Sequence, residues 1–374
     1  MKAASGYRPA RELRVLVVDA ALGAMHVTPG VELARLFDRG DLLVVNDAAT
    51  LPASLHVGDV ELRLLGRVDD RTWRAALLGP GDWHTRTEDR PAPRAVAVGE
   101  ELRIGSLVAR VREVRPESPR LVTIALRHAD DDSLSALWSE LYRVGRPVQY
   151  AHVPEAYDLW DVQNAYAGRP WAVEMPSAGR VLTFDALAEL ARRGVEVATL
   201  THAAGLSSVG DPAIDAMLPM PERYEVPSRT WAAVARAERV VAIGTSVVRA
   251  LESVARTGRL AGETDLRIGP RTERRVVDAV LTGVHETEST HFALLGAFAP
   301  HAVLDASLAE TESADLFGHE MGDACLLWAQ TPAARRHGLS TGRPQERHRL
   351  PMVGGLPTGS PQAVDGLWAD PGAC

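Results

Sequence analysis

Cysteine is almost absent from this chain: Cys325 and Cys374 are the two cysteines among its 374 residues. Two cysteines exclude a scaffold held by several disulfides and a cysteine-rich zinc or iron–sulfur site, and they fit a reducing compartment. Long apolar runs are also lacking, because the run over 292–304 is interrupted by Pro300 and His301 and is too short to span a bilayer. Residues 1–15 contain no apolar segment of the kind that directs secretion. We therefore expect a cytoplasmic protein with no membrane partner.

Positive charge is in short supply as well. Lys and Arg number 41 against 49 Asp and Glu, which gives a formal net charge of −8. Composition therefore gives no support to a basic surface for nucleic acid, although a local basic groove is compatible with it. The sequence contains no glycine-rich phosphate-binding motif and no His-x₃-His or His-Glu-x-x-His spacing, and the carboxylates at 130–132 are typical of a solvated turn. We expect no metal ion in the functional site.

The overall composition, 46% hydrophobic and 24% charged residues, is typical of a globular protein. The length of 374 residues suggests two domains or one large one. Residues 58–149 form a distinct region, because short β-type runs follow one another there with turn signals and no helix between them. Within 107–112, apolar and polar residues alternate with period two. The region predicts a small antiparallel β-barrel or sandwich, with a short helix over 133–144 leading out of it.

Outside that region, strand-like and helix-like patterns alternate, which is typical of an α/β domain. The predicted strands are 13–18, 41–45, 195–200, 240–243 and 274–281, and the predicted helices are 30–41, 184–193, 229–239 and 291–298. A loop is expected over 211–227. We predict a large α/β domain over 1–57 and 150–330, an inserted small β-barrel domain over 58–149, and a Pro- and Gly-rich tail over 331–374.

The stretch from residue 240 to residue 256 is the most informative in the chain. An apolar run over 240–243 breaks at Gly244 and passes into a helical pattern whose buried stripe is Val247, Leu251 and Val254. The first amides of a helix that follows such a turn are unpaired, and the helix dipole favours an anion such as a carboxylate beside them. The alternative is that Thr245 or Ser246 simply caps a structural helix.

Polar residues follow several of the predicted strands, and ligands of open α/β sheets bind beyond the carboxyl ends of such strands. One polar strand end carries little information, because loops are polar in general. Several on one rim favour a binding site. The polar residues at these strand ends are Asn46, Asp47, His202, Thr245, Ser246 and His285.

Six segments carry recognisable motifs: GDLLVVNDAATLPASL at 40–55, QNAYA at 163–167, PSAG at 176–179, GTSVVRALES at 244–253, GETDLRI at 262–268 and MGDACLL at 321–327. These segments resemble the S-adenosylmethionine:tRNA ribosyltransferase-isomerases of queuosine biosynthesis. Their order and spacing extend over most of residues 10–330. The resemblance implies a large, barrel-like α/β domain with an inserted small antiparallel β-barrel, which agrees with the fold class predicted from the pattern.

The resemblance also implies that S-adenosylmethionine is a substrate and the donor of a ribosyl group. A base removes a proton from C5′, which the sulfonium acidifies, and the ribosyl part passes to an amine while adenine and methionine leave. In the family the acceptor is 7-aminomethyl-7-deazaguanine in tRNA. Such chemistry requires a base near C5′, a clamp for the methionine carboxylate and a wall that tolerates the sulfonium cation.

Some motif positions differ from the family pattern. Val181 occupies the place of a histidine after PSAG, and the segment MLPMPE keeps Glu222 while two family histidines are missing from it. Gly283 replaces an asparagine and Glu288 replaces a lysine. The acceptor is therefore either tRNA or a smaller amine. Two alternatives stay open, a diverged lyase, hydrolase or small-molecule transferase that uses S-adenosylmethionine, and a non-catalytic binder. For the protein itself we expect a monomer or a homodimer.

The candidate site residues combine the rim with the resemblance. Arg249 and the turn at 244–246 would hold the methionine carboxylate, unless Arg249 only pairs with Glu252 on the helix surface. Glu252 would otherwise face the sulfonium or the ribose, and Asp265 would bind ribose hydroxyls or cap its own turn. The expected cofactor-binding residues are Gly244, Thr245, Ser246, Arg249, Glu252 and Asp265.

For proton transfer we expect His202 and His285, although a lone histidine is more often structural, and Glu174 in place of a missing histidine. Trp160 or Trp171 would stack on adenine or serve packing. The expected substrate-binding residues are Asn46, Gln163, Tyr166, Ser177, Ser289 and Thr290.

Overall fold

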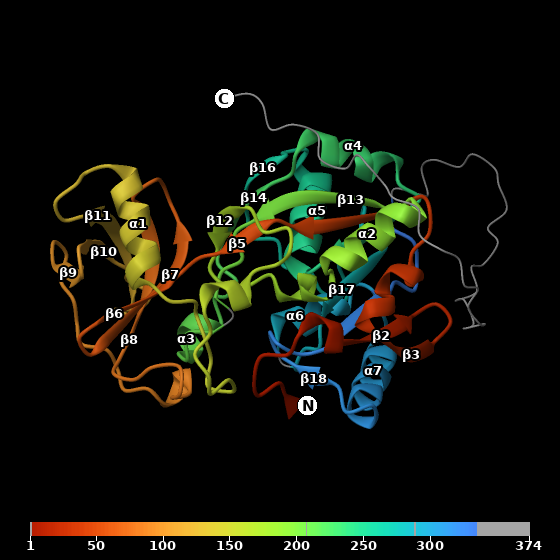
Figure 1. The fold of residues 1–374 in the computed structure, drawn as a ribbon, viewed down its shortest axis with the longest axis horizontal. Helices are drawn as coiled ribbons and strands as arrows, with labels where there is room; N and C mark the ends of the chain where they lie inside the picture. The colour runs from red at the N-terminus through yellow and green to blue at the C-terminus, as the bar shows by residue number, and fades with distance from the viewer. Residues whose placement is uncertain (1, 207, 288, 335–374) are drawn as a thin grey trace. The chain divides into compact units, whose positions relative to one another are not determined.

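The computed structural model describes residues 2–206, 208–287 and 289–334, and a nine-stranded mixed sheet organises the α/β part of them (Figure 1). Its order is β16-β14-β13-β4-β15-β17-β19-β2-β3. The neighbours β13, β4, β15 and β17 run parallel, whereas β19 is antiparallel to β17. The strands are β2 (Arg14–Asp19), β3 (Ala24–Pro29), β4 (Asp41–Asn46), β13 (Glu196–His202), β14 (Glu222–Glu225), β15 (Arg239–Ile243), β16 (Ala261–Thr264), β17 (Ala279–Gly283) and β19 (Ala324–Trp328).

Both faces of this sheet are buried, which explains why its central strands are continuous apolar runs. In β4, Leu42 and Val44 pack into one core cluster with helix α5 (Thr245–Thr257), while Leu43 and Val45 pack into a second cluster on the other face. The second cluster includes Leu190 of helix α2 (Phe184–Arg193). The strand-turn-helix predicted around residue 244 is therefore confirmed, and its helix closes one face of the sheet.

The β-rich region forms a separate six-stranded antiparallel sheet in the order β6-β7-β8-β11-β10-β9. Strands β6 and β9 lie against each other, so the sheet is nearly closed into a barrel. Helix α1 (Leu134–Val144), capped by Ser133, packs on β10 and β11. The strands are β6 (Ser54–Val57), β7 (Val60–Arg67), β8 (Thr72–Leu78), β9 (Glu101–Ile104), β10 (Leu107–Val114) and β11 (Leu121–His128). The predicted mixed α/β fold with a small barrel is confirmed, while the exact domain boundaries stay a prediction.

Shorter elements complete the described chain. Strand β5 (Ala48–Thr50) pairs in parallel with β12 (Arg169–Ala172). The remaining elements are strands β1 (Lys2–Ala3) and β18 (Phe317–Gly318), helices α3 (Pro212–Asp215), α4 (Ser228–Arg236), α6 (Thr290–Leu295) and α7 (His301–Ser313), and 3₁₀ turns at Ala10–Glu12, Gly30–Leu36, Thr87–Asp89, Leu159–Val162 and Ser177–Val181. None of the helices in the described residues combines the length and the apolar composition that a bilayer crossing requires.

Some predicted elements were wrong in extent. The helix expected over 30–41 is a 3₁₀ helix over Gly30–Leu36, and the loop expected over 211–227 contains α3 and β14. The strand expected over 274–281 begins only at Ala279, because the amides of residues 275–277 donate to the Glu252 carboxylate instead of a neighbouring strand. Most of the predicted tail over 331–374 lies outside the described residues.

Candidate functional site

Gly244 sits where β15 passes into α5, at the carboxyl edge of the sheet. Its φ is 100°, a left-handed conformation that a residue with a Cβ adopts only under strain. A Cβ there would lie 3.6 Å from Ser246 Oγ and 3.7 Å from Ala178 Cβ, so the backbone angle rather than crowding requires glycine. Ala178 belongs to the 3₁₀ turn that begins at Ser177. This turn therefore brings Ser177, a predicted substrate-binding residue, close to the start of α5.

The polar strand ends do lie on one rim, because β13, β4, β15 and β17 are adjacent and parallel. Asn46 and His202 are joined there by two hydrogen bonds: the His202 amide donates to Asn46 Oδ1 and Asn46 Nδ2 donates to the His202 carbonyl, each at 2.9 Å. Asn46 Oδ1 also accepts from the Ala48 amide at 3.1 Å. The Asn46 side chain therefore fixes the rim, and both of its polar atoms have protein partners.

Arg249 is buried, and its ion-pair partner is Glu222 of β14 rather than Glu252. The second oxygen of Glu222 accepts from the Gly205 amide at 2.8 Å, and Glu222 Oε2 lies 3.5 Å from His202 Nε2. Arg249, Glu222 and His202 thus form one buried polar group at the rim. Sequence reasoning had noted Glu222 without giving it a role, because β14 has no clear strand pattern.

Burial lowers the pKa of His202 to about 4 and outweighs the opposing effect of Glu222, so the ring is neutral near pH 7. Neither ring nitrogen of His202 has a hydrogen-bond partner within the described part of the chain. Buried polar atoms are nearly always hydrogen-bonded, and one left without a partner calls for an explanation such as a catalytic role or a bound water or ion. His202 is therefore a candidate for contact with a bound molecule.

His285 stacks on His291, a residue that sequence reasoning missed. The ring centroids are 4.9 Å apart and the planes are inclined by 17°. Thr282 Oγ1 lies 2.5 Å from His285 Nε2, and Thr245 Oγ1 lies 2.9 Å from His291 Nδ1. Burial, with His291 and His319 nearby, lowers the pKa of His285 to about 3, and burial also lowers the pKa of His291. In the sequence, His291 could have been recognised as a site residue from its position in the first turn of the apolar helix predicted over 291–298.

The predicted role of Glu252 in cofactor binding does not agree with where this side chain lies. Glu252 is fully buried, accepts hydrogen bonds from the amides of residues 275–277 and pairs with Arg256. Both oxygens are engaged in holding that loop against α5. Asp265, in contrast, is exposed, and Arg249 donates to the carbonyls of the residues on either side of it.

Glu174 accepts a hydrogen bond from the buried Tyr150 hydroxyl, which also reaches the Ser208 carbonyl at 3.4 Å. Both polar atoms of the Gln163 side chain bind the backbone of Thr50: Oε1 accepts from the Thr50 amide and Nε2 donates to the Thr50 carbonyl, each at 2.9 Å. These two predicted site residues therefore fix loops beside the rim.

The other predicted substrate residues differ in surroundings. Tyr166 packs its hydroxyl against Gly179, where even a Cβ would collide with it. Ser289 is the N-cap of α6 and accepts from the Phe292 amide at 3.1 Å, while Thr290 is exposed. Glu288 lies outside the described residues.

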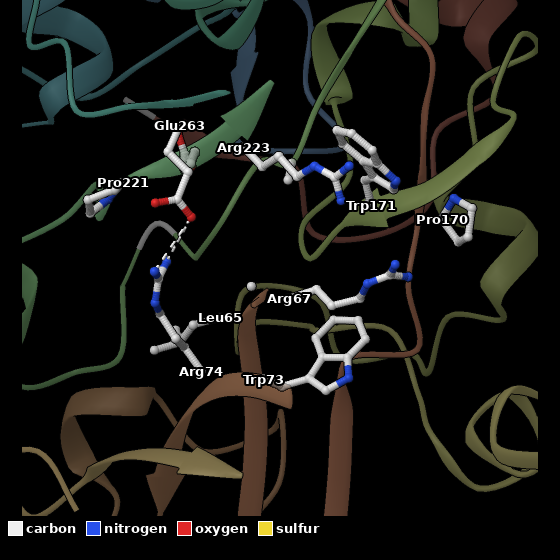
Figure 2. A pocket seen from close by; sticks show the side chains of 12 residues that line it. Leu65, Arg67, Trp73, Arg74, Pro170, Trp171, Pro221, Arg223 and Glu263 are labelled. Carbon is white, nitrogen blue, oxygen red and sulfur yellow. Dashed lines mark hydrogen bonds and ion pairs between the residues drawn. The ribbon is translucent and has the colours of Figure 1, made fainter. Parts of the chain in front are cut away.

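A hollow whose empty space is about 430 Å³ when the adjoining open solvent is included is lined by the barrel strands β7 and β8 together with residues that border the rim (Figure 2). Trp171 lies between two guanidinium groups, with Arg169 Cζ 4.2 Å and Arg223 Cζ 3.9 Å from its ring centroid. Arg74 approaches Glu263 at 3.4 Å. The lining includes Leu65, Arg67, Trp73, Arg74, Pro170, Trp171, Ala203, Glu222, Arg223 and Glu263.

The hollow shares Glu222 with the buried Arg249–Glu222–His202 group. Four arginines on or beside its walls form a local cationic surface on a chain of net charge −8, and three of them also pair with carboxylates, Arg67 with Asp70, Arg74 with Glu263 and Arg169 with Glu225. Of the two tryptophans in the lining, Trp73 is only 2% exposed. The arginines were not noticed in the sequence because they are spread from β7 to β14. Trp160, the other tryptophan considered for stacking, is 86% exposed.

Comparison with known proteins gives consistent matches. Residues 1–327 match the family described as "Queuosine biosynthesis protein". The chain is 34% identical over 316 residues to S-adenosylmethionine:tRNA ribosyltransferase-isomerase of Sorangium cellulosum, covering 76% of this chain and 84% of that protein. The protein of the same name from Anaeromyxobacter dehalogenans is 33% identical over 333 residues, with 84% and 92% covered. A crystal structure of S-adenosylmethionine tRNA ribosyltransferase from Thermotoga maritima aligns with a TM-score of 0.47 at 23% identity, covering 87% of this chain and 95% of that one.

Proposed function

This chain belongs to the queuosine biosynthesis protein family, and from that premise we propose that it transfers the ribosyl part of S-adenosylmethionine to an amine on a base in tRNA. Adenine and methionine are the leaving products. The family match over residues 1–327 carries the proposal, and the polar rim of the sheet supplies side chains of the kinds that the reaction needs.

The methionine end of the cofactor would bind at the start of α5. The first amides of that helix and the Arg249 guanidinium favour a carboxylate, and Gly244 lets the backbone approach closely. Glu222, which lies beside Arg249, would then face the sulfonium in the role that the sequence had suggested for Glu252. A carboxylate next to a sulfonium stabilises the cation in a site from which water is excluded.

The base that removes the C5′ proton must be unprotonated when the cofactor binds. His285 fits this requirement, because its pKa is lowered to about 3 by burial and by the neighbouring histidines. In the tautomer whose Nε2–H donates to Thr282 Oγ1, Nδ1 is the unprotonated nitrogen that would accept the proton. His202, also neutral at the rim, is the group that would donate or accept at the adenine end.

The acceptor would approach through the hollow lined by Trp171 and the arginines. The guanidinium groups of Arg67, Arg74 and Arg223 suit backbone phosphates, and Arg223 is held in place against the ring of Trp171. This local surface favours tRNA over a small amine as acceptor. Glu222 lines the hollow, so the acceptor would come close to the side chain beside which the cofactor would lie.

The test is incubation of the full chain with S-adenosylmethionine and tRNA that carries the aminomethyl deazaguanine base, followed by mass spectrometry of the tRNA and of the small products. We expect a ribosyl adduct on the tRNA together with adenine and methionine in equal amounts. Adenine released without an acceptor would instead identify a lyase or hydrolase, S-adenosylhomocysteine as the product would refute ribosyl transfer, and binding without turnover would identify a binder.

A further inference from the structure

Two loops that are far apart in the sequence bring three metal-binding side chains together. His152 follows helix α1, while His319 and Glu320 lie in the turn between β18 and β19. One potential ligand atom from each of the three lies within 4.8 Å of the others, and all three side chains are partly buried. His152 Nε2 and Glu320 Oε2 are 2.9 Å apart. The cluster is thus compact enough to converge on one ion and open enough for an ion to enter.

The composition of the cluster is typical of transition-metal sites. Two imidazoles and one carboxylate, with an open position, are the ligands of a common class of catalytic zinc site, and the same set also binds Fe²⁺. Glu286 adds another oxygen at the mouth, because its Oε1 lies 3.7 Å from His319 Nε2 and its side chain is 61% exposed. Either this carboxylate or water suits the fourth position of a tetrahedral ion.

The surroundings hold the ligands in place. The His152 ring is flanked by His319 at 4.4 Å and by Tyr150 at 6.4 Å, and the Tyr150 hydroxyl is fixed by Glu174. His319 has a φ of 66°, a conformation that costs free energy for a residue other than glycine and that is often found at functional sites. Its carbonyl accepts from the Gly322 amide at 2.9 Å, which closes the turn.

We propose that His152, His319 and Glu320 bind one divalent transition-metal ion, zinc by the chemistry of the ligands, with Glu286 or water as the fourth ligand. The proposal departs from the expectation of no metal, which rested on ligand spacing along a single helix. It does not depend on the proposed function. The simpler alternative is a hydrogen-bonded His–carboxylate pair, as His301 forms with Asp305 at 2.9 Å, but that exposed pair is not part of a three-ligand cluster in the described residues.

The experiment titrates Zn²⁺ into the full chain after dialysis against a chelator, with calorimetry as the readout. We expect one ion to bind per chain, and Glu320→Gln and His152→Ala to weaken binding at least about tenfold. His301→Gln is the matched control, since it removes an equally short His–carboxylate contact, and it should bind as the wild type does. The absorption bands of Co²⁺ in the same titration should report nitrogen and oxygen ligands in the wild type and change in Glu320→Gln.

Absence of stoichiometric binding, or equal binding by the wild type and both cluster variants, would overturn the proposal. The second result would locate the ion elsewhere, for example at the histidines of residues 335–374. Circular dichroism of the metal-free variants shows whether each one folds. Glu320→Gln nearly preserves the size of the side chain and keeps the test decisive if His152→Ala does not fold.

Discussion

Arg249 fixes the backbone on both sides of Asp265, because its guanidinium donates to the carbonyl of Thr264 at 3.3 Å and to that of Leu266 at 3.0 Å. The exposed Asp265 carboxylate is therefore positioned by a buried cation of helix α5. The same guanidinium pairs with Glu222. One side chain thus couples the start of α5, the end of β16 and the candidate cofactor site, and replacing it is expected to affect both stability and binding.

Arg249→Ala should lower the free energy of unfolding by about 3 kcal/mol, because it leaves the Glu222 carboxylate, whose side chain is only 11% exposed, without its cation. Urea unfolding measures this loss. The double variant Arg249→Met with Glu222→Gln should recover most of the stability, since no unpaired charge remains, and should still bind S-adenosylmethionine weakly in calorimetry. Restored binding in the double variant would show that Arg249 has only a structural role.

His285→Gln should reduce kcat by about 10²-fold or more while leaving the affinity for S-adenosylmethionine nearly unchanged, as expected for loss of a base. Single-turnover kinetics together with calorimetry separate the two effects. His26→Gln, at an exposed position on β3, is the control and should behave as the wild type does. Equal turnover by His285→Gln and the wild type would remove His285 from the mechanism.

Arg223→Ala should weaken tRNA binding at every salt concentration and reduce the slope of log K against log salt by about 1, because one phosphate contact is lost. Trp171→Ala should weaken binding with little change in that slope, because it removes the ring that positions Arg169 and Arg223 but leaves both cations in the chain. Filter binding over a range of salt concentrations measures both. Arg35→Ala removes an exposed arginine that pairs with Glu32 and should change neither quantity.

Because of His202, the free energy of unfolding should be smaller in mild acid than at neutral pH. Its pKa is about 4 in the folded protein and about 6.5 when unfolded, so between these values only the unfolded chain binds the proton and stability falls as pH falls. At 1.36 kcal/mol per pH unit, the loss between about pH 6.5 and pH 5 is about 2 kcal/mol. Urea unfolding of the wild type and of His202→Asn tests this; identical pH slopes for the two proteins would contradict it.

The sequence predicted those parts of the fold that depend on neighbouring residues. The strand-turn-helix at Gly244 is encoded in one stretch, since the apolar run, the glycine and the helical stripe follow one another. The barrel strands were readable as short β-type runs between turn signals, and the run RAVAV at 94–98 was expected to be one of them. That run does not form a strand; Arg94 and the Ala97 amide both bind Glu100 and close a turn.

The site was harder to predict because its contacts join distant residues. The partner of Arg249 is 27 residues away on β14, and the side chains that meet at Glu320 come from segments 168 residues apart. No local pattern marks such pairs. The rim of strand ends was predictable in kind, since parallel neighbours place their carboxyl ends together, but the full burial of Glu252 depended on the loop at 275–277.

Strand β4 is a partition between two separate apolar compartments, one that receives Leu42 and Val44 and one that receives Leu43 and Val45. Inserting a single residue into this strand would send each side chain into the opposite compartment and turn Asn46 away from His202. The frame that carries the rim therefore tolerates changes in side-chain volume far better than changes in length, and natural length variation in this protein should avoid residues 41–46.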